Sequence, residues 1–169
     1  KKKSLIAFVG ATWTLLIYML KLRKNKTEVD INKLNTSLTT INKILDELNR
    51  YLMIHINNQI KAGADVVQIF DSWAGLVPNE NLNDYIFKPN GKIIDFCKKK
   101  KIPSISFPKG LKEKYEDFNK IVKPDGINID SETDPLWAKE KLRNVVIQGG
   151  LDPKTLLKPE EDIIKIATK

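Results

Sequence analysis

The chain offers few of the side chains on which nucleophilic or metal chemistry is usually built. Its single cysteine, Cys97, excludes a disulfide framework and cannot by itself supply a thiolate metal cluster. Its single histidine, His55, leaves a histidine-based zinc site without a second imidazole. Any Ser-His-Asp triad would also have to use that one residue. Metal-dependent and triad chemistry are therefore disfavoured.

Polar and turn-forming residues instead gather at five places where short apolar runs end. These are Gly10-Ala11-Thr12-Trp13-Thr14, Asp71-Ser72-Trp73-Ala74-Gly75, Pro108-Lys109-Gly110, Asp130-Ser131 and Gln148-Gly149-Gly150-Leu151-Asp152-Pro153. Each taken singly also has a plain structural reading, because glycines turn a chain, aspartates cap helices and tryptophans fill cores. Five ends of the same character favour one shared cleft.

The net charge says less about which kind of partner the chain binds. The 169 residues carry a formal charge of +8, yet only three of the 29 basic residues are Arg, at positions 23, 50 and 143. Nucleic-acid readers favour Arg, whose fork matches guanine edges and phosphates, so nucleic-acid binding is not expected. The lysines suit either a solvated surface or a polyanionic small substrate, and composition does not separate these two readings.

The N-terminus imitates a membrane signal. Lys1-Lys2-Lys3 precede an apolar run from Leu5 to Leu22, but Gly10 and several polar residues interrupt it and no small-residue cleavage site follows. The run divides into a short, fully buried strand at 5–9 and a helix at 14–22. We therefore expect no membrane segment.

Beyond it, apolar strands alternate with amphipathic helices. Strands are predicted near 5–9, 66–70, 104–107, 126–129 and 145–148. Helices are predicted at about 38–60, 93–100, 112–122, 135–142 and 159–167, with a shorter helical stretch at 82–87. Asn35, Thr36 or Ser37 can cap the long helix, Gly63 ends it, and Asp134 caps a later one. His55 lies beside the apolar stripe of the long helix, where an ordinary surface or half-buried position is expected.

Short unalternating strands separated by helices predict a parallel sheet in a single α/β domain over residues 1–169. Five strands allow an open doubly wound sheet or an incomplete barrel, since a closed barrel needs eight. Gly149-Gly150 comes nearest to a dinucleotide fingerprint, but lacks the third glycine, so nucleotide binding is not expected.

Three of the strand ends resemble the motifs of the uroporphyrinogen decarboxylase family. Phe8-Val9-Gly10-Ala11-Thr12-Trp13-Thr14-Leu15 with Tyr18-Met19 is the first. The second and most specific runs from Ala62 to Gly75, and Gln148 to Pro153 resembles a late motif. The motifs follow the family's order across the whole chain. The resemblance implies an incomplete TIM-type (β/α)₈ barrel, with about five of the eight βα units covered.

The resemblance also implies an activity. Family members remove carbon dioxide from the four acetate side chains of uroporphyrinogen III, giving coproporphyrinogen III for haem and other tetrapyrroles. They use no metal and no organic cofactor. It implies a cytoplasmic enzyme that is a homodimer at full length, and a polycarboxylate substrate for which a basic cleft would be suitable. Neither nucleic acid nor a membrane is expected as a partner.

Three residues of this chain match the family's substrate-binding positions. Tyr18 matches the tyrosine near the reacting acetate, Ser72 matches a substrate-contacting serine, and Phe70 aligns less closely with an aromatic of the cleft wall. Lys109 is expected nearby. Without a functional role, Tyr18 would be an ordinary tyrosine on a helix face and Ser72 an ordinary serine in a turn.

Departures from the family leave the principal acid unassigned. The Arg-Gln-Ala-Gly-Arg-Tyr-type run, the catalytic aspartate and the Gly-His-Gly segment do not occur in these residues. Thr12 replaces a proline, Lys21 and Leu22 replace an acidic-Gly pair, and Ser131 replaces an aromatic. The catalytic residues are therefore unknown here, and we expect the 169 residues to be an inactive fragment of a working carboxy-lyase.

Two alternatives stay open. The chain could instead be a non-catalytic remnant or tetrapyrrole-binding module of the same fold. Corrinoid-linked methyltransferases share the barrel but need a zinc site with His and Cys ligands, and neither Cys97 nor His55 follows a predicted strand.

Overall fold

The computed structural model describes residues 3–25, 28–34 and 37–168 and contains one parallel sheet with helical connections. The strands, in the spatial order β1-β2-β3-β4-β5, are β1 (Ile6–Gly10), β2 (Val66–Asp71), β3 (Ser104–Pro108), β4 (Gly126–Ile129) and β5 (Val146–Gly149). Every adjacent pair is parallel. The spatial order equals the chain order, which is the arrangement of consecutive βα units in a barrel.

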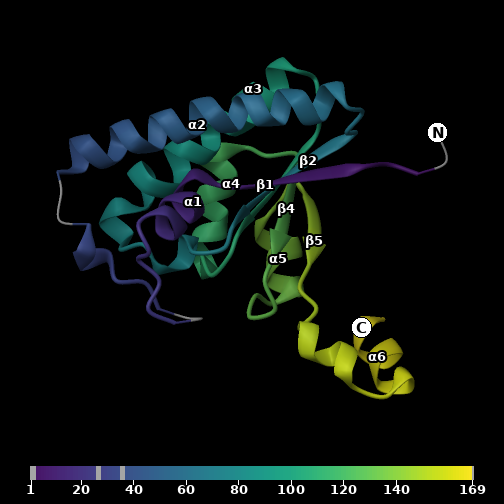
Figure 1. Ribbon diagram of the computed structural model, residues 1–169. Coiled ribbons are helices and arrows are strands. Elements are labelled where there is room, and N and C mark those ends of the chain that lie inside the picture. The colour runs from purple at the N-terminus through teal and green to yellow at the C-terminus, as the bar shows by residue number, and fades with distance from the viewer. Residues whose placement is uncertain (1–2, 26–27, 35–36, 169) are drawn as a thin grey trace.

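The helices follow the strands in turn. They are α1 (Thr12–Met19), α2 (Leu38–Lys61), α3 (Lys88–Lys99), α4 (Tyr115–Val122), α5 (Pro135–Lys141) and α6 (Glu160–Ala167). Shorter turns are η1 (Ile31–Lys33), η2 (Ala74–Leu76), η3 (Asn79–Asn81), η4 (Asn83–Phe87), η5 (Lys112–Lys114) and η6 (Pro153–Leu157). Figure 1 shows α2 as the longest helix, lying along the molecule beside α3, and α6 projecting at the carboxyl end.

Local chemistry sets the helix ends much as the sequence predicts. The Ser37 hydroxyl accepts the Thr40 backbone N–H at 3.2 Å, which satisfies a free donor of the first turn of α2. The other two candidate caps, Asn35 and Thr36, lie outside the described residues. Gly63 follows α2 with φ +103°, a conformation that glycine adopts without strain. Asp134 caps α5 by accepting the Leu136 N–H at 2.9 Å.

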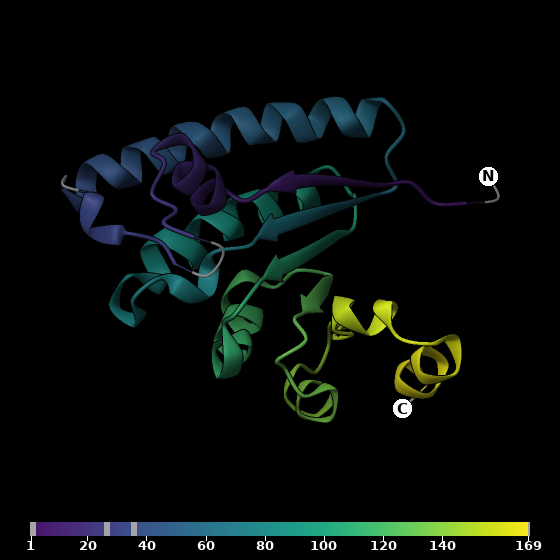
Figure 2. The ribbon, with the colours of Figure 1, turned by 60° about the horizontal axis from the view of Figure 1, so that its bottom comes forward.

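The main core lies between the sheet and the helices. α1, α2, α3 and α4 contact one another in succession, and α1 to α3 also contact the strands (Figures 1 and 2). Alternate strand residues such as Val67, Ile69 and Ile127 point into this core and are almost fully buried. The other face of the sheet, which we call the inner face, is much less covered.

Three predictions about the elements were wrong in part, two of which concern β1 and α3. The first strand is not fully buried, since the side chains of Ile6 and Phe8 are 46% and 68% exposed. β1 is an edge strand, and these side chains lie on the inner face, which no helix of the described chain covers. α3 begins at Lys88 rather than Ile93, because Pro89 occupies its first turn, where a missing N–H costs no helical hydrogen bond.

The apolar run near the N-terminus forms β1 and then α1, as its division at Gly10 predicts. The bounds predicted for this helix, 14–22, were wrong in part: α1 begins at Thr12 and ends at Met19, because Lys21 turns the chain with φ +52°. Within the described residues, no helix combines the length and apolar character needed to cross a membrane.

Candidate functional site

Trp73 is the meeting point of the first two motifs. Its side chain is 7% exposed, and the Tyr18 ring meets it edge-on with ring centroids 6.3 Å apart. Trp13 is completely buried, stacks on Tyr85 at 5.0 Å and donates its indole N–H to the Trp73 carbonyl at 3.3 Å. Trp13 is therefore a core residue that positions Trp73, while Tyr18 is half exposed and available to a ligand.

The neighbours Asp71 and Ser72 have opposite surroundings, because successive residues at a strand end point in opposite directions. Asp71 is 1% exposed and accepts hydrogen bonds from Thr14 Oγ1 and Asn90 Nδ2, each at 2.9 Å. Burial raises the pKa of Asp71 to about 6, although both hydrogen bonds favour the ionised form. Asp71 joins α1 and α3 to the end of β2 and is not accessible to a ligand.

Ser72 lines a pocket of about 360 Å³ at the carboxyl ends of β2, β3 and β4. Its wall consists of Ser72, Trp73, Gly75, Leu76, Lys109, Gly110, Lys112, Asp130, Ser131 and Glu132. The position agrees with the rule that parallel α/β folds build their sites at this end of the sheet. Lys109 lines this pocket together with Ser72, as expected, whereas Tyr18 and Phe70 are not among its lining residues.

Asp130 is engaged by its own surroundings. Its carboxylate accepts hydrogen bonds from the Gly110 N–H at 2.7 Å, the Tyr115 hydroxyl at 3.0 Å, the Thr133 hydroxyl at 2.9 Å and the Glu132 N–H at 3.1 Å. Burial tends to raise the pKa of Asp130, but these hydrogen bonds outweigh it and hold the pKa below the ordinary 3.8. Asp130 is thus an ionised anchor for the loops after β3 and β4.

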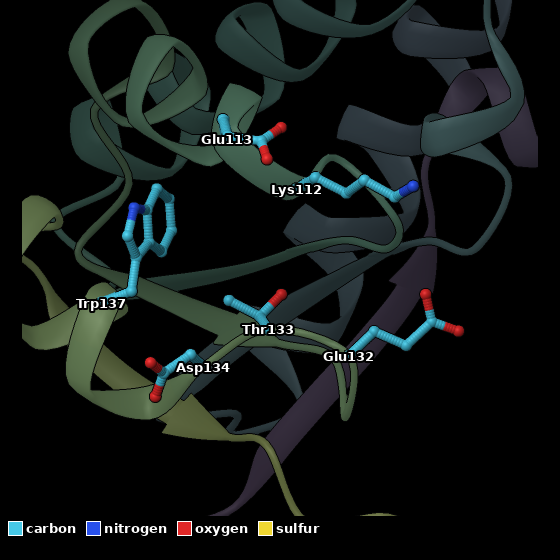
Figure 3. A pocket seen from close by; sticks show the side chains of 6 residues that line it. All are labelled: Lys112, Glu113, Glu132, Thr133, Asp134 and Trp137. Carbon is cyan, nitrogen blue, oxygen red and sulfur yellow. The ribbon is translucent and has the colours of Figure 1, made fainter.

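A second pocket of about 340 Å³ adjoins the first and shares Lys112 and Glu132 with it. Figure 3 shows its lining side chains, with Trp137 on one side and Lys112 and Glu132 on the other. Its remaining residues are Glu113, Thr133 and Asp134. The expected basic cleft is not formed by these residues, since the lysines of both pockets are matched or outnumbered by carboxylates.

Phe70 lies on the inner face of the sheet rather than in the Ser72 pocket. Its ring meets those of Phe8 and Phe107 edge-on, with centroids 6.0 and 5.8 Å away. The three phenyl rings form an aromatic row across β1, β2 and β3. Contact of Tyr18, Ser72 or Phe70 with a substrate remains a prediction.

Metal ligands do not converge in the described part of the chain, where we find no group of three His, Cys, Asp or Glu side chains that could hold a metal ion. Cys97 is completely buried, and burial raises the pKa of its thiol to about 11, so it remains protonated at neutral pH. His55 is exposed on the surface of α2, as expected.

Sequence reasoning missed several residues of this region. Lys112, Glu132 and Trp137 line the pockets but lie one turn or more beyond the strand ends, where polar residues are usually solvated. Arg23 was also missed: its guanidinium carbon lies 5.6 Å from the centroid of the Trp73 ring. No local pattern marks this contact, which joins residues fifty positions apart.

Comparison with known proteins agrees with the geometry. A family model described as Uroporphyrinogen decarboxylase (URO-D) matches residues 1–169. The chain is 38% identical to the uroporphyrinogen decarboxylase of Orientia tsutsugamushi strain Boryong, over 98% of this chain and 51% of the relative. It is also 38% identical to that of Rickettsia bellii and 35% identical to that of Jannaschia, each time over 93% of this chain and 47% of the relative.

The chain therefore spans about half the length of the curated relatives that it matches. Its five parallel βα units correspond to about half of a TIM-type barrel, in which the uncovered inner face is the barrel interior. Because the family model matches the chain from end to end, and the motifs lie at the strand ends where such a barrel carries its site, this chain belongs to the uroporphyrinogen decarboxylase family.

Proposed function

We propose that this chain supplies half of the active site of a uroporphyrinogen decarboxylase. The substrate is uroporphyrinogen III, the product is coproporphyrinogen III, and the four acetate arms each lose carbon dioxide. The observation that carries the proposal is the family match over all 169 residues. The edge-on contact of Tyr18 with Trp73, which lines the strand-end pocket together with Ser72, supports it.

The chemistry needs a proton and an electron sink rather than a metal. A proton adds to the pyrrole ring, the ring accepts the electron pair of the breaking C–C bond, and carbon dioxide leaves. A second proton converts the remaining CH₂ into CH₃ while the ring releases the first one, so each arm consumes one proton overall. Polar groups that hold the pyrrole and stabilise the changing charge act best in a site that excludes water.

The two aspartates at the very ends of strands, Asp71 of β2 and Asp130 after β4, are poor candidates for the proton donor. Asp71 has a suitable pKa of about 6, but it is buried between α1 and α3 and no substrate can reach it. Asp130 can be reached from the Ser72 pocket, but its pKa is lowered, so it stays ionised. We therefore assign the acid to the family's catalytic aspartate, which is not among residues 1–169.

In this proposal Tyr18 and Ser72 bind the substrate, and Phe70 forms part of the apolar wall of the barrel interior. The remaining features follow from the family resemblance: a cytoplasmic homodimer that uses no metal or organic cofactor and binds no nucleic acid.

The experiment uses the complete polypeptide that the gene encodes. It is incubated anaerobically with uroporphyrinogen III, and coproporphyrin is measured by chromatography after oxidation. We expect turnover without added metal, and we expect Tyr18→Phe to lower kcat/KM about 10–100-fold, because a hydroxyl that contacts the reacting arm is lost. Tyr51→Phe is the matched control, since Tyr51 is 60% exposed on α2 and Tyr18 is 51% exposed.

Each negative result has a distinct meaning. A folded protein that binds uroporphyrin but releases no carbon dioxide would favour the alternative of a tetrapyrrole-binding module. A folded protein that neither binds nor turns over the tetrapyrrole would contradict both readings. Equal losses in Tyr18→Phe and Tyr51→Phe would contradict the role of Tyr18.

A further inference from the structure

The pockets at the strand ends have too little positive charge to bind a polycarboxylate by themselves. A tetrapyrrole with eight carboxylates needs several cationic partners, yet the two lysines of the Ser72 pocket, Lys109 and Lys112, face the two carboxylates of Asp130 and Glu132. Arginine is the better partner for a carboxylate, because its planar fork donates two parallel hydrogen bonds. The arginines of this chain are therefore the first place to look for a further binding group.

Two of the three arginines are engaged far from the site. Arg50 forms an ion pair with Glu47 at 3.0 Å and lies over the Tyr51 ring on α2. Arg143 donates its Nε–H to the Glu140 carbonyl at 3.1 Å, beyond the end of α5. Both positions are explained by these local contacts.

Arg23 differs in what surrounds it. Its Nε–H donates to the Asn25 carbonyl at 2.9 Å, and its guanidinium lies over the Trp73 ring. Among the described residues, no carboxylate forms an ion pair with Arg23, and we find no hydrogen bond from its two terminal nitrogens. These are the nitrogens that bind a carboxylate, and they lie beside the tryptophan that joins Tyr18 to Ser72.

The backbone around Arg23 fixes this placement. Leu22 is 2% exposed and accepts the Asp30 N–H at 2.8 Å, and Arg23 forms an antiparallel bridge with Val29. The segment after α1 thus folds back on itself and holds the guanidinium at the edge of the site. An arginine that already stacks on an aromatic ring loses little side-chain freedom when it binds a ligand.

We propose that Arg23 is a substrate-binding residue that forms a bidentate contact with a carboxylate arm of the tetrapyrrole, at a position next to Tyr18 and Trp73. This inference rests on the proposed function for the identity of the ligand. It assigns to a residue outside the recognised motifs a share of the carboxylate binding that the pocket lysines cannot supply alone.

The test compares the complete polypeptide with three variants, using uroporphyrinogen III as the substrate. Arg23→Gln removes the charge and should raise KM about 10-fold with kcat within about twofold, which corresponds to the loss of one charge-assisted contact. Arg23→Lys keeps the charge but not the planar fork, so its KM should lie between the KM of the wild type and that of Arg23→Gln. Arg143→Gln is the matched control, because Arg143 also donates Nε–H to a nearby backbone carbonyl.

A second measurement tests tetrapyrrole binding by Arg23 without relying on turnover, and it also shows whether the substitution disturbs the fold. Titration with uroporphyrin, a stable octacarboxylate, is followed by tryptophan fluorescence at several salt concentrations. We expect Arg23→Gln to raise Kd about 10-fold and to weaken the salt dependence of binding, while the melting temperature stays within about 2 °C of the wild type.

The outcomes distinguish this inference from the proposed function. An active wild type whose KM is unchanged in Arg23→Gln, or rises equally in Arg143→Gln, would overturn the role of Arg23 and leave the decarboxylase intact. An inactive wild type would contradict the proposed function. The uroporphyrin titration would then still decide about Arg23, since equal Kd values for the two glutamine variants would overturn it.

Discussion

At the scale of single residues, position relative to the strand end separates buried groups from groups that line a pocket. Asp71 and Ser72 are adjacent in the chain, yet one is buried beneath two helices and the other lines a pocket. A perturbed pKa alone would point to Asp71 as an acid, because its pKa is about 6. Its burial and its neutral partners Thr14 and Asn90 indicate instead that it holds the site together.

The titration of Asp71 gives a test of this role. Because its pKa is about 6 in the folded chain and 3.8 ordinarily, the folded state binds the proton more tightly. The contribution of Asp71 to the free energy of unfolding is therefore largest below about pH 3 and falls by about 3 kcal/mol in total as the pH rises from about 3 to about 7. Above that window it stays constant.

Asp71→Asn should remove this dependence. An amide at position 71 can still accept from Asn90 and donate to the Thr14 hydroxyl, so the contacts survive without the charge. Urea denaturation at pH 4 and pH 7.5 should show the variant gaining about 2–3 kcal/mol relative to the wild type across that interval. Asp117→Asn, on the surface of α4, is the control. A constant difference between Asp71→Asn and wild type would contradict the raised pKa.

At the scale of elements, the candidate site depends on the close approach of two loops. Gly75, after β2, donates its N–H to the Lys109 carbonyl at 2.9 Å. A Cβ atom at position 75 would lie 2.3 Å from the Gly110 carbonyl oxygen, much closer than atoms can approach. Only glycine therefore lets the loop that carries Ser72 and Trp73 pack against the loop that carries Lys109.

Gly75→Ala should consequently separate these loops. We expect a loss of about 1–3 kcal/mol in the free energy of unfolding and weaker uroporphyrin binding, because one wall of the Ser72 pocket moves. Gly91→Ala is the matched control: Gly91 lies within α3, nothing lies within 4 Å of an added Cβ, and alanine should stabilise the helix by about 0.5–1 kcal/mol. Thermal denaturation of both variants checks this, and equal effects would contradict the packing argument.

At the scale of the whole molecule, the five-stranded sheet leaves large apolar surfaces uncovered. Phe8 and Val146, on the two edge strands, are 68% and 71% exposed, and Leu157 in η6 is 88% exposed. The two edges also present unpaired parallel backbone groups. A closed barrel would cover these side chains and pair these edges, so residues 1–169 by themselves should associate or aggregate.

Phe8→Lys tests this expectation in residues 1–169 expressed alone. Phe8 projects from an edge strand onto the inner face and lies in the aromatic row, so a charge there should reduce hydrophobic dye binding and increase solubility. Leu136→Lys, on α5, replaces an apolar side chain of similar exposure (76%) outside the sheet and should have less effect. Light scattering and dye fluorescence are the measurements. A wild-type chain that is monomeric and binds no dye would contradict the exposed inner face.

The sequence by itself determined where the strands lie and which family the chain belongs to. All five strands fall within one residue or so of their predicted positions, because short apolar runs bounded by glycine, proline and aspartate leave little choice. Ser37 and Asp134 cap their helices as expected, since capping depends on neighbours only a few residues away.

Only the tertiary structure decided which of these residues line a pocket and which are buried. The prediction that the first strand is fully buried was wrong, because its apolar sequence pattern is the same whether or not another element covers the inner face. The contact of Arg23 with Trp73, the burial of Asp71 and the pocket positions of Lys112 and Glu132 join residues distant in sequence. Local spacing carries no information about such contacts, which arise only when the packing of helices on the sheet fixes the direction of each side chain.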